Sequence, residues 1–220
     1  MQKRPRYGIL GGTFDPPHLG HLALAQEVYA RLALDRVWFM PAGDPPHKRG
    51  QSISAAAQRL AMVKLAVAPD ARFGVLTLEL ERAGPSYTAD TLHALRALWG
   101  AEAHLCLILG WDMLAYLPQW RRPEAVIAEA DQIAAVHRIG AETPPGEVER
   151  LAARLPGIAA KLVILPAPRF EISGTLLRER VASGLPVRYL VPDAVEEYIQ
   201  TEGLYLPPVR APHVEETRGG

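Results

Sequence analysis

Residues 8–26 read GILGGTFDPPHLGHLALAQ, an apolar run followed by two glycines, a proline-containing turn and a stretch with helical spacing. A short apolar run that ends in glycines is typical of a buried strand, and the Leu/Ala spacing after it is typical of a helix. The stretch therefore predicts a strand at 7–10 that turns through Gly11 and Gly12 into a helix at 19–34. Glycines at such a turn let a ligand approach the backbone, and the free N–H groups of a helix start attract anions. We expect a phosphate to bind at this turn.

The same alternation of short apolar runs and helical stretches continues along the chain. Strands that alternate with helices predict an α/β fold, here a single-domain, Rossmann-like parallel sheet with helices on both faces. Ligands of such sheets bind beyond the carboxyl ends of the strands. Further strands are expected at 36–41, 73–80, 104–109, 132–136 and 162–165, and further helices at 55–67, 88–99, 123–130, 146–155, 174–183 and 193–202.

The composition is that of a globular protein. Its 220 residues are 49% hydrophobic, which is enough to bury the core of one compact domain. No repeat or flexible linker divides the chain, so the domain is expected to cover residues 1–205. Residues 206–220 are rich in proline and charge and end in two glycines, and we expect a disordered tail there.

Charge and cysteine content exclude several classes of protein. The 24 Lys and Arg residues balance the 24 Asp and Glu residues, so no overall positive field favours nucleic acid as a partner. No apolar run approaches the ~18 residues of a membrane span, so no membrane partner is expected. The single cysteine excludes a disulfide framework and favours a reducing compartment, which predicts a cytoplasmic protein.

Two histidines follow the glycine pair. Three residues apart at a helix start, His18 and His21 share one face beside the positive end of the helix dipole. Protonated imidazoles have the wrong charge for that position, which indicates that a bound polyphosphate supplies negative charge. The alternative is that each histidine caps the helix or packs in the core; we expect neither in the core. A zinc site is disfavoured, because no third ligand stands nearby at a suitable spacing.

A second segment, EISGTLLR at 171–178, has similar features. Ser173 is placed to cap a helix, and Thr175 and Arg178 then share a face. A cation again occupies the first helical turn, where an acidic residue is preferred, and this again indicates an anionic ligand. The alternative is an ordinary serine cap with a solvated arginine.

A third basic element follows the strand at 36–41. Its proline-rich loop presents His47, Lys48 and Arg49. The alternative is that these charged side chains are simply exposed to solvent, as is usual in such a loop. Its place on the ligand side of the sheet favours Lys48 as a point charge for a phosphate.

These segments resemble a known superfamily. GGTFDPPHLGH (11–21) resembles the nucleotidyltransferase signature, a Gly-rich turn followed by His-x-Gly-His, and ISGTLLR (172–178) resembles the second motif, ISSTxxR. Within the superfamily, the chain resembles the bacterial nicotinate-mononucleotide adenylyltransferases over residues 7–205. The segments that carry this resemblance are FMPAGDPPHK (39–48), PSYTADTL (85–92), GWDMLAYLPQW (110–120) and YLVPDAVEEYIQTEGLY (189–205).

The resemblance implies transfer of the adenylyl group of ATP to nicotinate mononucleotide, giving nicotinate adenine dinucleotide and pyrophosphate on the route to NAD. The nucleophile is a phosphate already ionised at pH 7, so no general base is needed and catalysis rests on orientation and charge neutralisation. Mg²⁺ is the implied cofactor, held mainly by the ATP phosphates and not by protein ligands. The implied catalytic residues are His18, His21, Lys48 and Arg178.

The same resemblance implies two sets of binding residues. The pyridine ring is expected on the face of Trp120, whose alternative role is core packing. Backbone N–H groups at Tyr87 and Thr88 are expected to meet the nicotinate carboxylate. The residues implied for ATP are Gly11, Gly12, Thr13, Phe14, His18, His21, Gly110, Asp112, Ser173, Thr175 and Arg178, and those for the mononucleotide are Thr13, Lys48, Tyr87, Thr88 and Trp120.

Two positions depart from the family pattern. Gly174 stands where Ser is usual, and AVHRIG (135–140) lacks the usual Arg-Pro-Gly, which leaves the role of Arg138 open. Among rival functions, adenylyl transfer to phosphopantetheine uses the same phosphate motifs but not the PPHK, SYTADTL and LPQW segments. Nicotinamide mononucleotide as the acceptor, and an inactive nucleotide-binding module on the same fold, remain alternatives.

Overall fold

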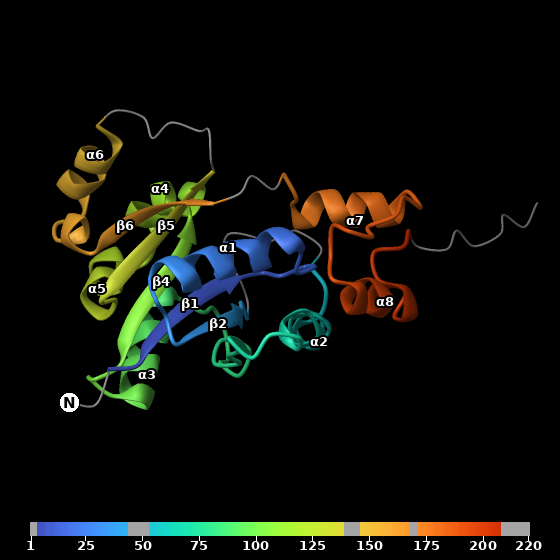
Figure 1. Cartoon of the computed structure of the whole chain (residues 1–220), viewed down its shortest axis with the longest axis horizontal. Helices are drawn as coiled ribbons and strands as arrows, with labels where there is room; N and C mark the ends of the chain where they lie inside the picture. The colour runs from blue at the N-terminus through green and yellow to red at the C-terminus, as the bar shows by residue number, and fades with distance from the viewer. Residues whose placement is uncertain (1–3, 44–52, 139–145, 168–170, 208–220) are drawn as a thin grey trace, which may run out of the picture.

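A computed structural model of the chain describes residues 4–43, 53–138, 146–167 and 171–207. It contains one sheet of six parallel strands in the order β3-β2-β1-β4-β5-β6 (Figure 1). The predicted Rossmann-like parallel sheet is therefore confirmed. The order of the strands reverses between β1 and β4, and ligands of open α/β sheets bind outside the carboxyl ends of the strands at such a point.

Strands and helices alternate along the chain. The strands are β1 (Arg6–Gly12), β2 (Arg36–Pro41), β3 (Phe73–Val75), β4 (His104–Gly110), β5 (Gln132–Arg138) and β6 (Leu162–Ala167). The helices are α1 (Leu19–Arg31), α2 (Ala56–Val67), α3 (Thr88–Trp99), α4 (Trp111–Tyr116), α5 (Pro123–Glu129), α6 (Glu147–Arg154), α7 (Gly174–Ala182) and α8 (Asp193–Thr201), with 3₁₀ turns η2 (Leu117–Gln119) and η3 (Ile158–Ala160). Among the described helices, none is long and apolar enough to cross a membrane.

The central strands are buried on both faces. In β4, Leu105, Leu107 and Leu109 enter one apolar cluster, whereas Cys106 and Ile108 enter another. Residues of α3 and α5 complete the first cluster, and residues of α1 and α2 complete the second. Because successive side chains of a strand point to opposite faces, burial on both faces makes β4 a continuous apolar run in the sequence. The prediction of helices on both faces is confirmed.

The last two helices pack against α2. Leu177 of α7 and Val195 and Ile199 of α8 form a third apolar cluster with Met62 and Ala66 of α2. Figure 1 shows α7 and α8 together at one end of the molecule, beyond α2. The second predicted phosphate segment leads into α7. The packing of α7 on α2 therefore holds this segment in place.

Two predicted elements are longer than the observed ones. The helix expected at 19–34 ends at Arg31, because the chain turns through Ala33 in a left-handed backbone conformation (φ 46°). The strand expected at 73–80 ends at Val75, because a tight turn follows. In this turn the carbonyl of Thr77 accepts hydrogen bonds from the N–H groups of Leu80 and Glu81. The helix α4 was not predicted, since six residues are too few to show a helical period.

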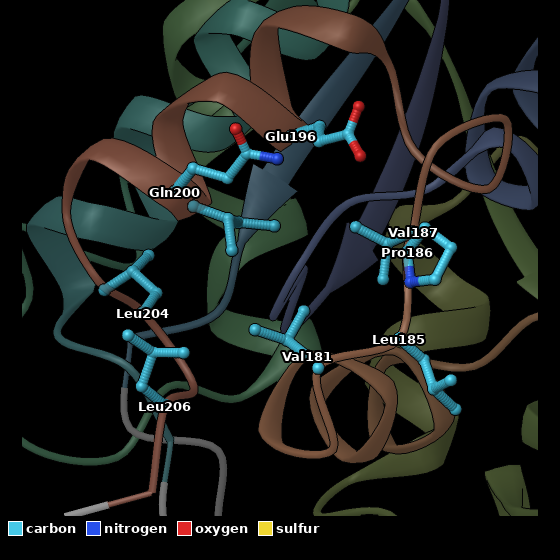
Figure 2. A pocket seen from close by; sticks show the side chains of 10 residues that line it. Val181, Leu185, Pro186, Val187, Glu196, Gln200, Leu204 and Leu206 are labelled. Atoms are coloured by element: carbon cyan, nitrogen blue, oxygen red, sulfur yellow. The ribbon is translucent and has the colours of Figure 1, made fainter. Parts of the chain in front are cut away.

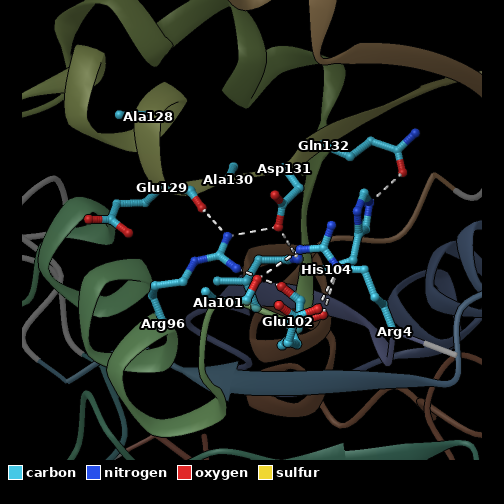
Figure 3. Close-up of polar contacts among 12 residues, drawn as sticks. Arg4, Arg96, Ala101, Glu102, His104, Ala128, Glu129, Ala130, Asp131 and Gln132 are labelled. Atoms are coloured by element: carbon cyan, nitrogen blue, oxygen red, sulfur yellow. Dashed lines mark hydrogen bonds and ion pairs between the residues drawn. The ribbon is translucent and has the colours of Figure 1, made fainter. Parts of the chain in front are cut away.

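A polar network closes the amino ends of the strands (Figure 3). The guanidinium of Arg96 donates to the carbonyl of Glu129 (2.8 Å) and pairs with the carboxylate of Asp131 (2.7 Å). The same carboxylate accepts from the backbone N–H of Leu105 (2.8 Å), at the start of β4. Side chains at this edge therefore satisfy backbone groups where strands and helices begin and end. The site residues that the structure describes stand at the opposite edge.

Candidate functional site

The first predicted phosphate segment leaves the sheet where the strand order reverses. Gly11 and Gly12 pair with Met40 and Pro41 of β2, so both glycines belong to β1 and not, as predicted, to the turn. The turn follows them, with Phe14 in the left-handed region (φ 51°). A Cβ on Gly12 would lie 2.9 Å from the ring of Phe14. Glycine at this position therefore makes room for the buried phenyl ring.

The two predicted histidines meet at the start of α1. Their rings are stacked, with centroids 3.7 Å apart. The Nδ1 atom of His21 accepts a hydrogen bond from the backbone N–H of His18 (3.2 Å), and its ring lies edge-on to that of Phe14 (4.9 Å). The shared face predicted from the spacing is confirmed. The capping alternative is also realised, because His21 satisfies a backbone donor at the helix start.

His18 is more buried than the sequence suggests. It is 7% exposed, and its Nδ1 has no hydrogen-bond partner among the described residues. Burial lowers the pKa of His18 to about 4, so the ring is neutral at pH 7. The expectation that neither imidazole lies in the core is wrong for His18. A buried polar nitrogen without a partner indicates that another group, such as a phosphate oxygen, completes its hydrogen bonding.

Asp15 connects the turn before the histidines to three other parts of the chain. It is 3% exposed. One carboxylate oxygen accepts from the hydroxyl of Tyr205 (2.7 Å), and the other accepts from the backbone N–H of Ser54 (3.1 Å). From α7, Nη1 of Arg178 donates to the Asp15 carbonyl (2.8 Å) and lies 3.9 Å from the carboxylate. Burial and the Asp15 hydrogen bond raise the pKa of Tyr205, so its hydroxyl remains a donor at neutral pH.

Arg59 brings a positive charge into the same buried region. The residue is 2% exposed, and its guanidinium donates to the carbonyls of Ser54 (3.1 Å), Thr13 (3.0 Å) and Gly43 (3.2 Å). Burial lowers the pKa of Arg59, and the negative charge of Asp15 opposes that shift. Arg59 therefore joins the backbone that follows β1 to the backbone that follows β2.

The second predicted segment, 171–178, leads into α7, and its Arg178 lies in the second turn of that helix and not, as predicted, in the first. Ser173 caps the helix by accepting a hydrogen bond from the N–H of Leu176 (3.2 Å), as predicted. Nη2 of Arg178 donates to Oγ1 of Thr175 (3.4 Å), so these two residues share a face, as predicted. The Arg178 side chain is only 22% exposed and also bonds to Asp15, which excludes the alternative of a solvated arginine. The structure thus brings the two predicted phosphate segments together.

The residues expected to bind the mononucleotide form a second group. Tyr87 is the N-cap of α3, and Thr88 is its first residue. The guanidinium carbon of Arg121 lies 4.7 Å from the centroid of the Tyr87 ring, which connects the start of α3 to the segment after η2. Trp120, in the same segment, is partly buried and packs against the first apolar cluster. Part of the indole therefore serves core packing, the alternative noted for this residue.

Gly43 joins the two groups. Its carbonyl accepts from Arg59, and a Cβ on Gly43 would lie 2.2 Å from the carbonyl oxygen of Glu79 and 3.4 Å from Oγ of Ser86. Ser86 directly precedes Tyr87, and its hydroxyl donates to the Glu79 carbonyl (3.3 Å). Gly43 is therefore in close contact with the network behind the phosphate segments and with the strand-to-helix connection that leads to Tyr87. A side chain at this position would push the network behind the phosphate segments away from the connection that leads to Tyr87.

The remaining predicted residues differ in how far the structure describes them. Gly110 ends β4 and caps α4, and Asp112 lies exposed in the first turn of α4, next to the point where the strand order reverses. Lys48 lies outside the described residues, as do the neighbouring His47 and Arg49, and so does the side chain of Arg138. Within the described ranges, no group of three or more His, Cys, Asp or Glu residues is placed to hold a metal ion.

A cavity of about 270 Å³ lies between α7 and α8 (Figure 2). Apolar side chains line most of it, with Glu196 and Gln200 on one side. Its lining includes none of the predicted site residues. The cavity is therefore separate from the arrangement at the carboxyl edge of the sheet.

Three residues behind the phosphate segments were missed by the sequence analysis. They are Asp15, Arg59 and Tyr205, which lie in different parts of the chain and meet only in the fold. One signal was available for Arg59: it stands three and four residues before Met62 and Val63, on the buried face of α2. A charged residue on the apolar face of a helix indicates a buried polar network.

We expect replacement of Gly174 by alanine to destabilise the protein. A Cβ at this position would lie 2.7 Å from the carbonyl oxygen of Asp15, a backbone atom that cannot easily move. The overpacking costs about 1–3 kcal/mol, which outweighs the gain of up to about 1 kcal/mol from the higher helix propensity of alanine. Urea unfolding measures the difference, and Gly110→Ala is the control because nothing lies within 4 Å of a Cβ there. A Gly174→Ala variant as stable as the parent protein would contradict the close contact.

We also expect His18 to make stability depend on pH. The unfolded chain binds a proton at this residue near pH 6.5 and the folded chain only near pH 4, so the free energy of unfolding falls as the pH falls between these values. From pH 7 to pH 5 the loss is about 2 kcal/mol. Urea unfolding at both pH values should show a loss smaller by this amount in His18→Gln than in the parent protein. Equal pH dependence of the His18→Gln variant and the parent would contradict the burial of His18.

Comparison with known proteins shows the family to which the chain belongs. A family model described as cytidylyltransferase-like matches residues 9–180. A Dehalococcoides mccartyi protein named "Probable nicotinate-nucleotide adenylyltransferase" is 47% identical over 198 residues, which cover 90% of this chain and 96% of the relative. A Roseiflexus protein of the same name is 48% identical over 198 residues, with the same two coverages.

Solved structures share the fold. One of them, Plasmodium falciparum nicotinic acid mononucleotide adenylyltransferase complexed with NaAD, superposes with a TM-score of 0.73 at 16% identity, covering 91% of this chain and 97% of that one. Identity this low supports the fold alone, whereas the family follows from the sequence matches. The chain belongs to the cytidylyltransferase-like family, and within it groups with the relatives that carry the nicotinate-nucleotide adenylyltransferase name.

Proposed function

We propose that this protein transfers the adenylyl group of ATP to nicotinate mononucleotide, a step of NAD biosynthesis. A phosphate oxygen of the mononucleotide attacks the α-phosphorus of ATP, and the bond from that phosphorus to the bridging oxygen of the β-phosphate breaks. The products are nicotinate adenine dinucleotide and pyrophosphate. The attacking oxygen is already ionised at pH 7, so the protein has to orient two anions and stabilise the charge of the leaving group.

The observation that carries the proposal is the meeting of the two phosphate segments at Asp15. The stacked rings of His18 and His21 stand at the start of α1, and Arg178, in the second turn of α7, reaches the loop that precedes them. Hydrogen-bond donors from two helix starts therefore face one edge of the sheet. Such a cluster suits a polyphosphate better than any neutral ligand.

Each residue of the phosphate cluster has a distinct task in this proposal. The buried Nδ1 of His18 gains an acceptor when a phosphate oxygen approaches, and the negative charge of the phosphate favours the protonated ring. His21 and Arg178 offer further donors to the triphosphate. Ser173 and Thr175 hold phosphate oxygens at the start of α7, and Lys48 adds a point charge. Mg²⁺ would be held mainly by the ATP phosphates and would offset their charge.

The mononucleotide is assigned to the second group. Its pyridine ring stacks on the exposed part of Trp120, and backbone N–H groups at Tyr87 and Thr88 meet the nicotinate carboxylate. Gly43 keeps this group next to the phosphate segments. We place the reaction in the cytoplasm, because a sequence with a single cysteine, Cys106, has no disulfide within the chain, which suits a reducing compartment.

Pyrophosphate release tests the proposal. Purified protein is incubated with ATP, Mg²⁺ and, in separate reactions, nicotinate mononucleotide, nicotinamide mononucleotide and phosphopantetheine. We expect the highest kcat/KM with nicotinate mononucleotide and loss of activity when EDTA removes Mg²⁺. Release with none of the three acceptors would favour an inactive nucleotide-binding module, and a preference for phosphopantetheine would overturn the proposed substrate.

Replacement of His21 by alanine tests the phosphate cluster. This histidine is preferred to His18, whose burial makes a folding defect hard to separate from a catalytic one. We expect kcat to fall by a factor of about 10² or more, in the range of a lost transition-state hydrogen bond. His93→Ala is the matched control, since that side chain is 76% exposed and pairs with Glu129 at a distance from the cluster. A His21→Ala enzyme with most of its kcat would remove this histidine from the mechanism.

A further inference from the structure

Two consecutive arginines extend from the segment after Trp120 to the start of α3. Arg122 pairs with Asp90 in the first turn of α3. Arg121 lies instead over the ring of Tyr87, with its guanidinium carbon 4.7 Å from the ring centroid. The two side chains therefore flank the N-terminus of α3 and contact different residues there.

The two arginines differ in how their charge is compensated. The carboxylate of Asp90 opposes the charge of Arg122. Arg121 is exposed, and within the described part of the chain no carboxylate lies in ion-pair distance of it. Together, the two arginines and Asp90 therefore carry one net positive charge at the start of α3. Arg121 supplies that charge.

The contact with Tyr87 positions the guanidinium without using its hydrogen-bond donors. A cation over a ring face is held through the face of the guanidinium plane or by its charge, so N–H groups at its edge remain able to donate. A planar guanidinium with donors at its edge matches the two oxygens of a carboxylate. An amide in place of the carboxylate lacks the negative charge and offers only one acceptor oxygen.

We propose that Arg121 binds the carboxylate of the nicotinate ring and is the residue that makes the enzyme prefer the acid to the amide mononucleotide. The inference rests on the proposed function, because it requires the mononucleotide to lie against Trp120 and the start of α3. Arg121 directly follows Trp120 in the chain and reaches Tyr87, so it lies between the residue assigned to the ring and the residues assigned to the carboxylate. The backbone N–H groups at Tyr87 and Thr88 orient the carboxylate, and Arg121 supplies the charge that discriminates.

The test compares Arg121→Gln with Arg122→Gln, which removes an equal charge from the neighbouring position. The kcat/KM values for nicotinate and nicotinamide mononucleotide are measured at saturating ATP and Mg²⁺. In Arg121→Gln we expect kcat/KM for the acid to fall about five- to tenfold through a higher KM, a modest effect because the site is partly exposed to solvent. The value for the amide should change less than about twofold, as expected for a group that makes no charged contact with it. In Arg122→Gln the ratio of the two values should stay that of the parent.

One further variant, one substitute measurement and two contrary outcomes complete the test. Arg121→Lys should recover part of the preference for the acid, because a lysine retains the charge but not the planar arrangement of donors. If the parent protein turns over nicotinamide mononucleotide too slowly to follow, the inhibition constant of that amide, measured in competition with nicotinate mononucleotide, replaces its kcat/KM. An unchanged acid-to-amide ratio in Arg121→Gln, or an equal fall for both mononucleotides, would overturn the role of Arg121. A parent protein that releases no pyrophosphate with the acid would instead overturn the proposed function.

Discussion

The buried contacts of Asp15 are the constraint on which the site depends. Through its carboxylate and its carbonyl, this residue accepts hydrogen bonds from Ser54, Tyr205 and Arg178, which belong to three separate parts of the chain. A buried carboxylate is costly unless hydrogen bonds and positive charge compensate it, and here both do so. The same contacts fix where α7 stands relative to α1. Asp15 therefore holds together the two segments that we propose to act on one ligand.

The surroundings of Asp15 explain two other features of the site. Gly174, which departs from the family pattern, lies where a Cβ would be 2.7 Å from the Asp15 carbonyl oxygen, so the absence of a side chain makes room for this backbone. His18, three residues after Asp15, is buried with a nitrogen that has no partner among the described residues and a pKa lowered to about 4. The protein thus holds a desolvated, neutral imidazole at the place where we propose that a phosphate supplies both an acceptor and a negative charge.

The sequence predicts the parts of this structure that repeat a local pattern. The strand β4 is a run of apolar residues because it is buried on both faces, and α3 begins and ends where its apolar spacing predicts. The histidine pair and the serine cap of α7 follow from spacing in the same way. Asp15, Arg59 and Tyr205 have no shared local pattern, because their contacts join residues as much as 190 positions apart. Networks of this kind appear only once the sheet has placed the loops.

The free energy of unfolding of an Asp15→Asn variant tests the central role of this residue most directly. The control is Asp70→Asn, which removes a surface carboxylate that is 25% exposed and paired with Arg72. Loss of one charge from a buried, hydrogen-bonded group costs about 3 kcal/mol or more, whereas loss of an exposed ion pair costs less than about 1 kcal/mol. Urea unfolding at pH 7 should therefore show a several-fold larger loss for Asp15→Asn. Equal losses for the two variants would contradict the account.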